Sequence, residues 1–108
     1  MLENLRLARE FTEGLSSAAE LAANRKTLYA VIRALEIVGE ATKRVPQEIR
    51  DRAPKVPWAA MAGMRDRLIH GYREVDTNLV WRTATTATVE AENQLRALLA
   101  ALDAGADD

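Results

Sequence analysis

The chain of 108 residues contains one histidine, and that histidine lies within the string RDRLIHGY at positions 65–72. An unperturbed imidazole titrates at about pH 6.5 and can give or take a proton at neutral pH. An arginine guanidinium stays charged and matches phosphate oxygens with two parallel hydrogen bonds. His70 and Arg65 therefore suit phosphate ester chemistry. Because 12 of the residues are arginine, the added Asp66, Gly71 and Tyr72 are what make the string specific.

Helical geometry does not bring the two groups together. On a regular helix Arg65 and His70 diverge by about 140°, whereas Asp66 and His70, four residues apart, share a face. Convergence needs a break near Gly71 or a second copy of the segment facing the first.

Metal-independent cleavage of an RNA phosphodiester needs a base for the 2'-hydroxyl, an acid for the leaving 5'-oxygen and a cation for the transition state. One histidine does not readily fill all these roles. In a twofold homodimer, two copies each of Arg65 and His70 could line one cleft, with Asp66 holding the imidazole tautomer. The structural alternatives are a surface or core histidine, solvated arginines, and Tyr72 as an anchor at the core edge.

The sequence offers no cysteine and no spaced histidine pair, so we expect neither a metal nor another cofactor. Glu36 and Glu40 share a helix face near Arg33 and Lys43. We interpret these carboxylates as a helix-surface or dimer-contact pair rather than as metal ligands.

Apolar spacing is helical almost throughout, which predicts an all-α fold: an antiparallel bundle of four main helices plus short ones. We expect one domain over 1–108, with 103–108 as a disordered tail. The motif helices are expected at a homodimer interface. Helices are predicted at about 2–13, from 18, at 25–44, at 47–52, from Pro57 to Gly71, and at 77–102, with caps at Ser17, Asn24 and Asp76.

The predicted core follows helical stripes on these segments. Its members are Leu5, Ala8 and Phe11; Leu28, Val31, Ile32, Leu35, Val38 and Thr42; Trp58, Met61, Met64 and Leu68; and Val80, Ala84, Ala87, Ala91, Leu95, Leu98 and Leu102.

Charge is distributed unevenly along the chain. The formal net charge is -1, yet residues 43–73 hold eight basic and three acidic side chains. This pattern predicts a positive face on an otherwise acidic body. No membrane span or leader segment is evident, and we expect a cytoplasmic protein.

Several segments together resemble the HEPN superfamily, and within it the HepT-like ribonuclease toxins. They are LEIVGEA at 35–41, the Pro57-Trp58 pair, the string at 65–72, and Val75-Asp76 with Trp81. The resemblance implies a metal-independent ribonuclease site of Arg65 and His70, with Asp66 as the polar residue after the arginine, in a homodimer. It also implies a minimal nucleotidyltransferase antitoxin that adds AMP to Tyr72.

A second function class stays open. The chain could be a non-catalytic helical subunit that docks to a nucleotidyltransferase partner and presents its substrate. Small residues in the first half of the last helix would suit such docking.

Overall fold

The computed structural model describes residues 1–70 and 74–106, and for residues 65, 68–70, 74 and 106 it describes the backbone alone. The elements are α1 (Leu2–Glu10), α2 (Ala18–Ala23), α3 (Arg25–Lys43), α4 (Gln47–Asp51), α5 (Trp58–Ala62), α6 (Met64–Leu68), β1 (Ile69–His70), β2 (Glu74–Val75), α7 (Thr77–Arg82), the π-helical turn η1 (Thr83–Ala87) and α8 (Thr88–Ala106).

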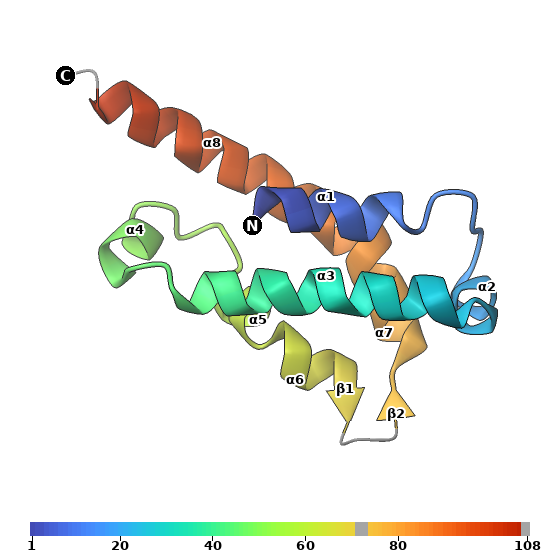
Figure 1. The fold of residues 1–108 in the computed structure, drawn as a ribbon. Helices are drawn as coiled ribbons and strands as arrows, with labels where there is room; N and C mark the ends of the chain where they lie inside the picture. The colour runs from blue at the N-terminus through green and yellow to red at the C-terminus, as the bar shows by residue number, and fades with distance from the viewer. Residues whose placement is uncertain (71–73, 107–108) are drawn as a thin grey trace.

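The all-α class is confirmed, because the regular secondary structure of the described residues is helical apart from a minimal antiparallel ladder (Figure 1). In this ladder Ile69 pairs with Val75 and His70 with Glu74. The antiparallel four-helix bundle and the homodimer stay predictions. Within the described residues no helix is both long and apolar enough to cross a membrane.

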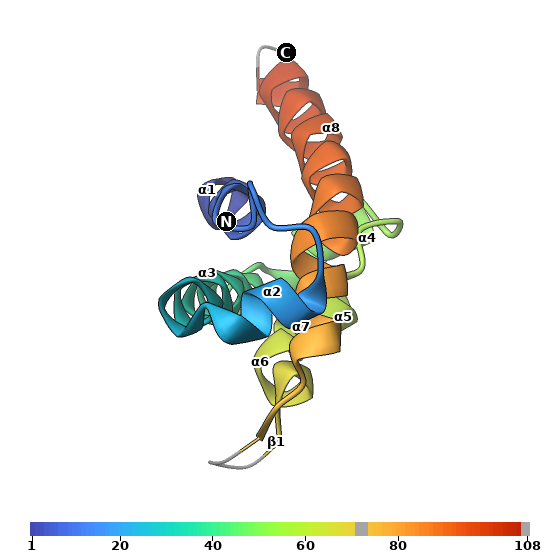
Figure 2. The same cartoon turned by 90° about the vertical axis from the view of Figure 1, so that its right-hand side faces the viewer.

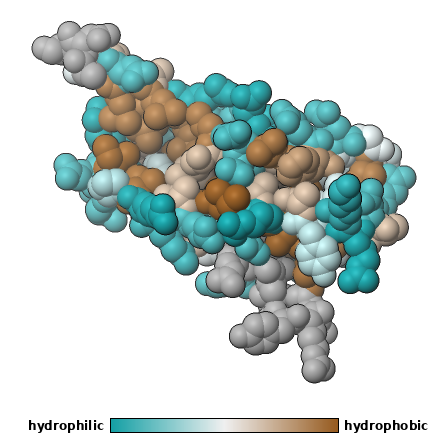
Figure 3. Space-filling view, in the orientation of Figure 1, coloured by the Kyte–Doolittle hydropathy of each residue, from teal (hydrophilic) through white to brown (hydrophobic). Residues whose placement is uncertain are grey.

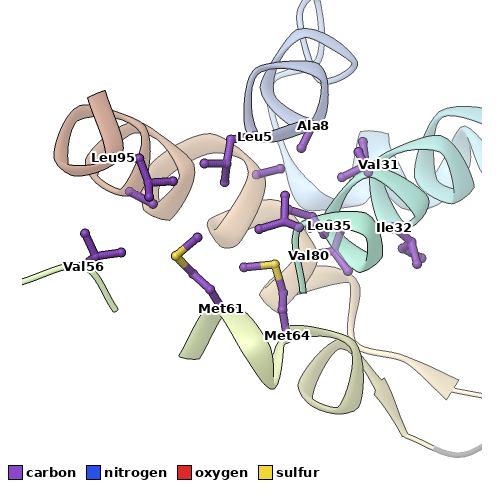
Figure 4. Packing of buried hydrophobic residues seen from close by; sticks show 14 of the residues in the cluster. Leu5, Ala8, Val31, Ile32, Leu35, Val56, Met61, Met64, Val80 and Leu95 are labelled. Carbon is purple, nitrogen blue, oxygen red and sulfur yellow. The ribbon is translucent and has the colours of Figure 1, made fainter. Parts of the chain in front are cut away.

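The core lies where α1, α3, α5–α6 and the α7–α8 helix meet. Leu5 and Leu35 are fully buried there, together with Val80 and Met61 (Figure 4). The second half of α8 runs beyond this core, so the molecule measures 51 × 29 × 18 Å along its principal axes (Figures 1 and 2). Burying these side chains removes apolar surface from water, which is the main force holding the helices together.

The predicted helix caps are confirmed. Ser17 Oγ accepts the backbone N–H of Glu20 at 3.2 Å, and the Glu20 carboxylate accepts the N–H of Ser16. Asn24 Oδ1 accepts from Thr27 at 3.1 Å, and Asp76 Oδ1 accepts from Leu79 at 3.0 Å. The bonds from Glu20, Thr27 and Leu79 each satisfy a backbone donor that the first helical turn leaves without a partner.

The motif helix was predicted wrongly. Instead of one helix from Pro57 to Gly71, α5 ends at Ala62, Gly63 follows, and α6 ends at Leu68. Gly63 has a non-helical conformation (φ -87°, ψ 6°). Residues 69 and 70 are then extended, because they pair with the strand that leads into α7.

Two predicted core positions are also wrong. Phe11 lies past the end of α1 and is 39% exposed. In the last helix the buried position is Thr88 rather than Ala87, because the wider turn of η1 shifts the buried stripe by one residue. The hydroxyls of Thr85 and Thr88 donate to the carbonyls of Trp81 and Ala84, each at 2.7 Å, and so satisfy carbonyls within this irregular stretch.

The expected disordered tail is partly helical. Helix α8 continues to Ala106, so residues 103–106 extend it. Residues 107 and 108 lie outside the described part.

Candidate functional site

Two short helices position the motif. Trp58 opens α5, and its indole Nε1 donates to the carbonyls of Arg50 and Ala53 at 3.2 and 3.0 Å. Met61 and Met64 are buried, as predicted, and fix α5 and α6 against the core (Figure 4). Helix α6 packs on α3 and α7. The backbone that carries Arg65 is therefore packed against α3 and α7.

The motif spans a change from helix to strand. Arg65 lies in the first turn of α6, and His70 lies in β1, beyond the helix end at Leu68. The divergence of 140° between them, which assumes an unbroken helix, does not apply. The same change removes the reason for expecting Asp66 and His70 on one helix face. The side chains of Arg65 and His70 are outside the described part, and so is the whole of Tyr72.

The described polar side chains of α6 face solvent. Asp66 and Arg67 are both exposed. Arg67 also borders a small cavity of about 90 Å³ whose lining includes Met61 and Met64 as well as Thr83 and Thr88. This cavity is the size of an apolar side chain and lies between the motif helices and the π-helical turn.

The carboxylates of α3 form surface ion pairs, as predicted. Arg33 Nη1 lies 3.4 Å from Glu36 Oε2 and 3.7 Å from Glu40 Oε1. Among the residues whose side chains the structure describes, no group of three acidic or histidine side chains could hold a metal ion.

A charge cluster that the sequence analysis did not identify joins the first and last helices. The Glu92 carboxylate accepts from Arg9 Nη2 at 2.6 Å and from Arg96 Nη2 at 2.8 Å, and it is 9% exposed. Hydrogen bonds from Arg96 and then from Arg9 hold the pKa of Glu92 below its ordinary value, against the opposing effect of burial. The spacing of Glu92 and Arg96, four residues apart, was the available signal for part of this cluster.

A second unpredicted interaction holds α4 against the end of α3. The Arg50 guanidinium donates to the carbonyls of Thr42 at 2.8 Å and Val45 at 3.1 Å. These contacts give the Thr42 carbonyl a second donor, besides the N–H of Val45, and satisfy the carbonyl of Val45 just beyond α3.

Comparison with known proteins gives consistent results. The family described as ribonuclease HepT-like matches residues 1–98. The probable ribonuclease HepT of Thermococcus cleftensis is 44% identical over 81 residues, which cover 75% of this chain and 73% of that protein. A Methanocaldococcus jannaschii protein with a provisional RNase name is 42% identical over 80 residues, covering 74% of this chain and 69% of that protein.

A Caldanaerobacter subterraneus protein, also provisionally named an RNase, is 46% identical over 70 residues, which cover 65% of this chain and 62% of that protein. No solved structure matches the chain significantly. The family match covers most of the chain, including α6 and the strand that carries His70. The chain therefore belongs to the HepT-like ribonuclease family of the HEPN superfamily.

Proposed function

We propose that this protein is a metal-independent endoribonuclease in which Arg65 and His70 act on one RNA phosphodiester. The observation that carries the proposal is the Arg65-to-His70 motif in a chain of the HepT-like ribonuclease family. The end of α6 at Leu68 supports it, because a break in the helix lets an imidazole and a guanidinium approach one point.

In the proposed reaction one imidazole acts as the base and a second one as the acid. One His70 imidazole takes the proton of the 2'-hydroxyl, and the 2'-oxygen forms a bond to phosphorus. The bond from phosphorus to the 5'-oxygen breaks, and a second, protonated imidazole donates to that oxygen. Arg65 stabilises the charge that builds on the phosphate oxygens. Asp66, the neighbour of Arg65, is assigned a supporting polar role.

Two imidazoles require two copies of the chain, so the enzyme is proposed to be a homodimer with its motif helices at the interface. Within that proposal, the protein is the toxin of a toxin-antitoxin pair. Its antitoxin would be a minimal nucleotidyltransferase.

The test is an RNA cleavage assay with the protein expressed without an antitoxin, in the presence of EDTA. We expect wild type to cleave, and His70→Ala and Arg65→Ala to lose at least about 100-fold in rate. Arg67→Ala is the matched control, since Arg67 lies on the same short helix and is exposed. Its rate should fall by less than about tenfold. Equal rates for wild type and His70→Ala would refute the catalytic assignment.

We also propose that the antitoxin silences the enzyme by adding AMP to Tyr72. Phosphate groups beside the arginines of the site would repel RNA and obstruct the cleft. After coexpression with the nucleotidyltransferase, intact mass should increase in multiples of AMP, and Tyr72→Phe should show no increase. Modification that persists in Tyr72→Phe would contradict this assignment.

A non-catalytic docking subunit is the second candidate, and one observation favours it. An apolar groove of about 430 Å³ lies between the start of α1, α4 and the second half of α8, and Leu99 beside it is 46% exposed (Figure 3). Such a surface suits a protein partner. This function predicts partner binding that survives loss of Arg65 and His70, without RNA cleavage by wild type.

A further inference from the structure

We infer that the basic residues around α4 form a second contact surface for the phosphate backbone of single-stranded RNA, remote from the motif. This inference rests on the proposed function, because it extends the path of the same substrate. We call the exposed residues Lys43, Arg44, Arg52 and Lys55 the α4 basic surface.

Within the described part of the chain, the α4 basic surface differs from several other basic side chains in its lack of ion pairs. Several arginines on α1, α3 and α8 lie within 4.0 Å of carboxylates, among them Arg9, Arg33 and Arg96. None of the ion pairs found among the described residues involves the α4 basic surface. These four cations are therefore available to a polyanion from solution, and phosphate contacts of this kind dominate the affinity of proteins for nucleic acids.

Side-chain hydrogen bonds hold the backbone that carries the α4 basic surface. The Arg50 guanidinium binds the carbonyls of Thr42 and Val45, next to Lys43 and Arg44. The Trp58 indole binds the carbonyls of Arg50 and Ala53, on either side of Arg52. Cations held on an ordered support lose less conformational entropy when they bind a ligand.

A groove lies between the α4 basic surface and α8. Residues 52–56 border a groove of about 320 Å³ whose opposite side is α8, with Ala97, Leu98 and Ala101 in its lining. Arg52 and Lys55 lie on its other side. The two cations of this open groove can bind the phosphate of a nucleotide unit, and the aliphatic floor between them and α8 leaves room for the rest of the nucleotide.

The α4 basic surface is close enough to the motif for one RNA strand to contact both. The α4 basic surface lies at the end of α3 that is opposite α2, and α5 and α6 connect it to the strand that carries His70 (Figure 1). At 1.5 Å per residue these two helices span roughly 16 Å. An RNA strand of several nucleotides can therefore contact the α4 basic surface and the motif together.

The test measures binding of a fluorescent, single-stranded RNA of about 20 nucleotides, in a His70→Ala background that prevents cleavage. The test variant is Lys43→Gln/Arg44→Gln/Lys55→Gln. Arg52 is kept because its guanidinium lies close to Gly105 of α8: its Nη2 is 3.9 Å from the position that a Cβ on this glycine would occupy. Substituting Arg52 would therefore also change the packing against α8. The control is Arg6→Gln/Arg25→Gln/Lys26→Gln, which removes the same number of exposed charges elsewhere.

We expect the test variant to bind at least about tenfold more weakly than the control at 0.1 M salt. The slope of its log affinity against log salt concentration should be less negative by about 2, because each phosphate contact to a single strand contributes about 0.7 to the slope and three contacts are lost. Equal affinity and equal slope for the two variants would overturn the inference. RNA cleavage by wild type, measured separately, distinguishes the two failures: binding as expected without cleavage refutes only the proposed enzyme.

Discussion

Among single residues, Glu92 links the two ends of the chain. It lies on α8, is buried, and accepts hydrogen bonds from Arg9 on α1 and Arg96 on its own helix. Arg9 and Arg96 are 33% and 52% exposed, so the desolvation cost falls mainly on the carboxylate. Two charge-assisted bonds offset that cost and give α1 a specific position on α8.

We predict that Glu92→Gln lowers the free energy of unfolding at pH 7 by roughly 1.5–3 kcal/mol, the range for hydrogen bonds to charged groups. Because the folded-state pKa of Glu92 lies below its ordinary value of 4.5, its contribution is fully present above pH 4.5. The contribution is lost as pH falls through the lowered pKa. Urea unfolding at a series of pH values should show the difference between wild type and variant narrowing in acid.

The control for this experiment is Glu10→Gln. Glu10 lies 4.0 Å from Arg6, and both side chains are about half exposed. Its substitution should change the free energy of unfolding by less than about 0.5 kcal/mol. Equal effects of the two substitutions would show that the Glu92 cluster does not stabilise the fold.

At the scale of elements, the sequence predicted best where the signal is local. Asn24 and Asp76 cap their helices because a short polar side chain can reach the backbone donors of the first turn. The stripe from Leu28 to Thr42 is buried as expected, since one long helix repeats its apolar spacing over several turns.

The motif segment could not be predicted in the same way. Strands β1 and β2 have two residues each, too few for an alternating pattern to be recognised. The helical pattern of Met61, Met64 and Leu68 continues through Gly63, which hides the break between α5 and α6. The π-helical turn likewise leaves a spacing of three and four residues intact while exchanging Ala87 for Thr88 in the core. The placement of His70 therefore depends on its backbone pairing with Glu74, four residues further on, between strands too short to show a recognisable pattern.

At the scale of the whole molecule, the proposed catalysis by two imidazoles would make a homodimer the functional unit. A single chain supplies one histidine, and that histidine follows a helix whose end is packed on α3 and α7. If the proposed mechanism holds, a dimer with one intact subunit lacks either the acid or the base. Activity should then follow the fraction of dimers with two intact subunits rather than the fraction of intact chains.

Subunit mixing tests this dependence. Wild-type and His70→Ala chains, mixed in equal amounts and exchanged, should leave about a quarter of the dimers with both imidazoles. At constant total protein, we expect RNA cleavage to fall to about a quarter of the wild-type rate. Mixing with Lys26→Gln chains, which change an exposed residue of α3, controls for the exchange procedure and should preserve the full rate. A fall to only about half with His70→Ala would mean that each subunit cleaves RNA alone, and the shared site would be rejected.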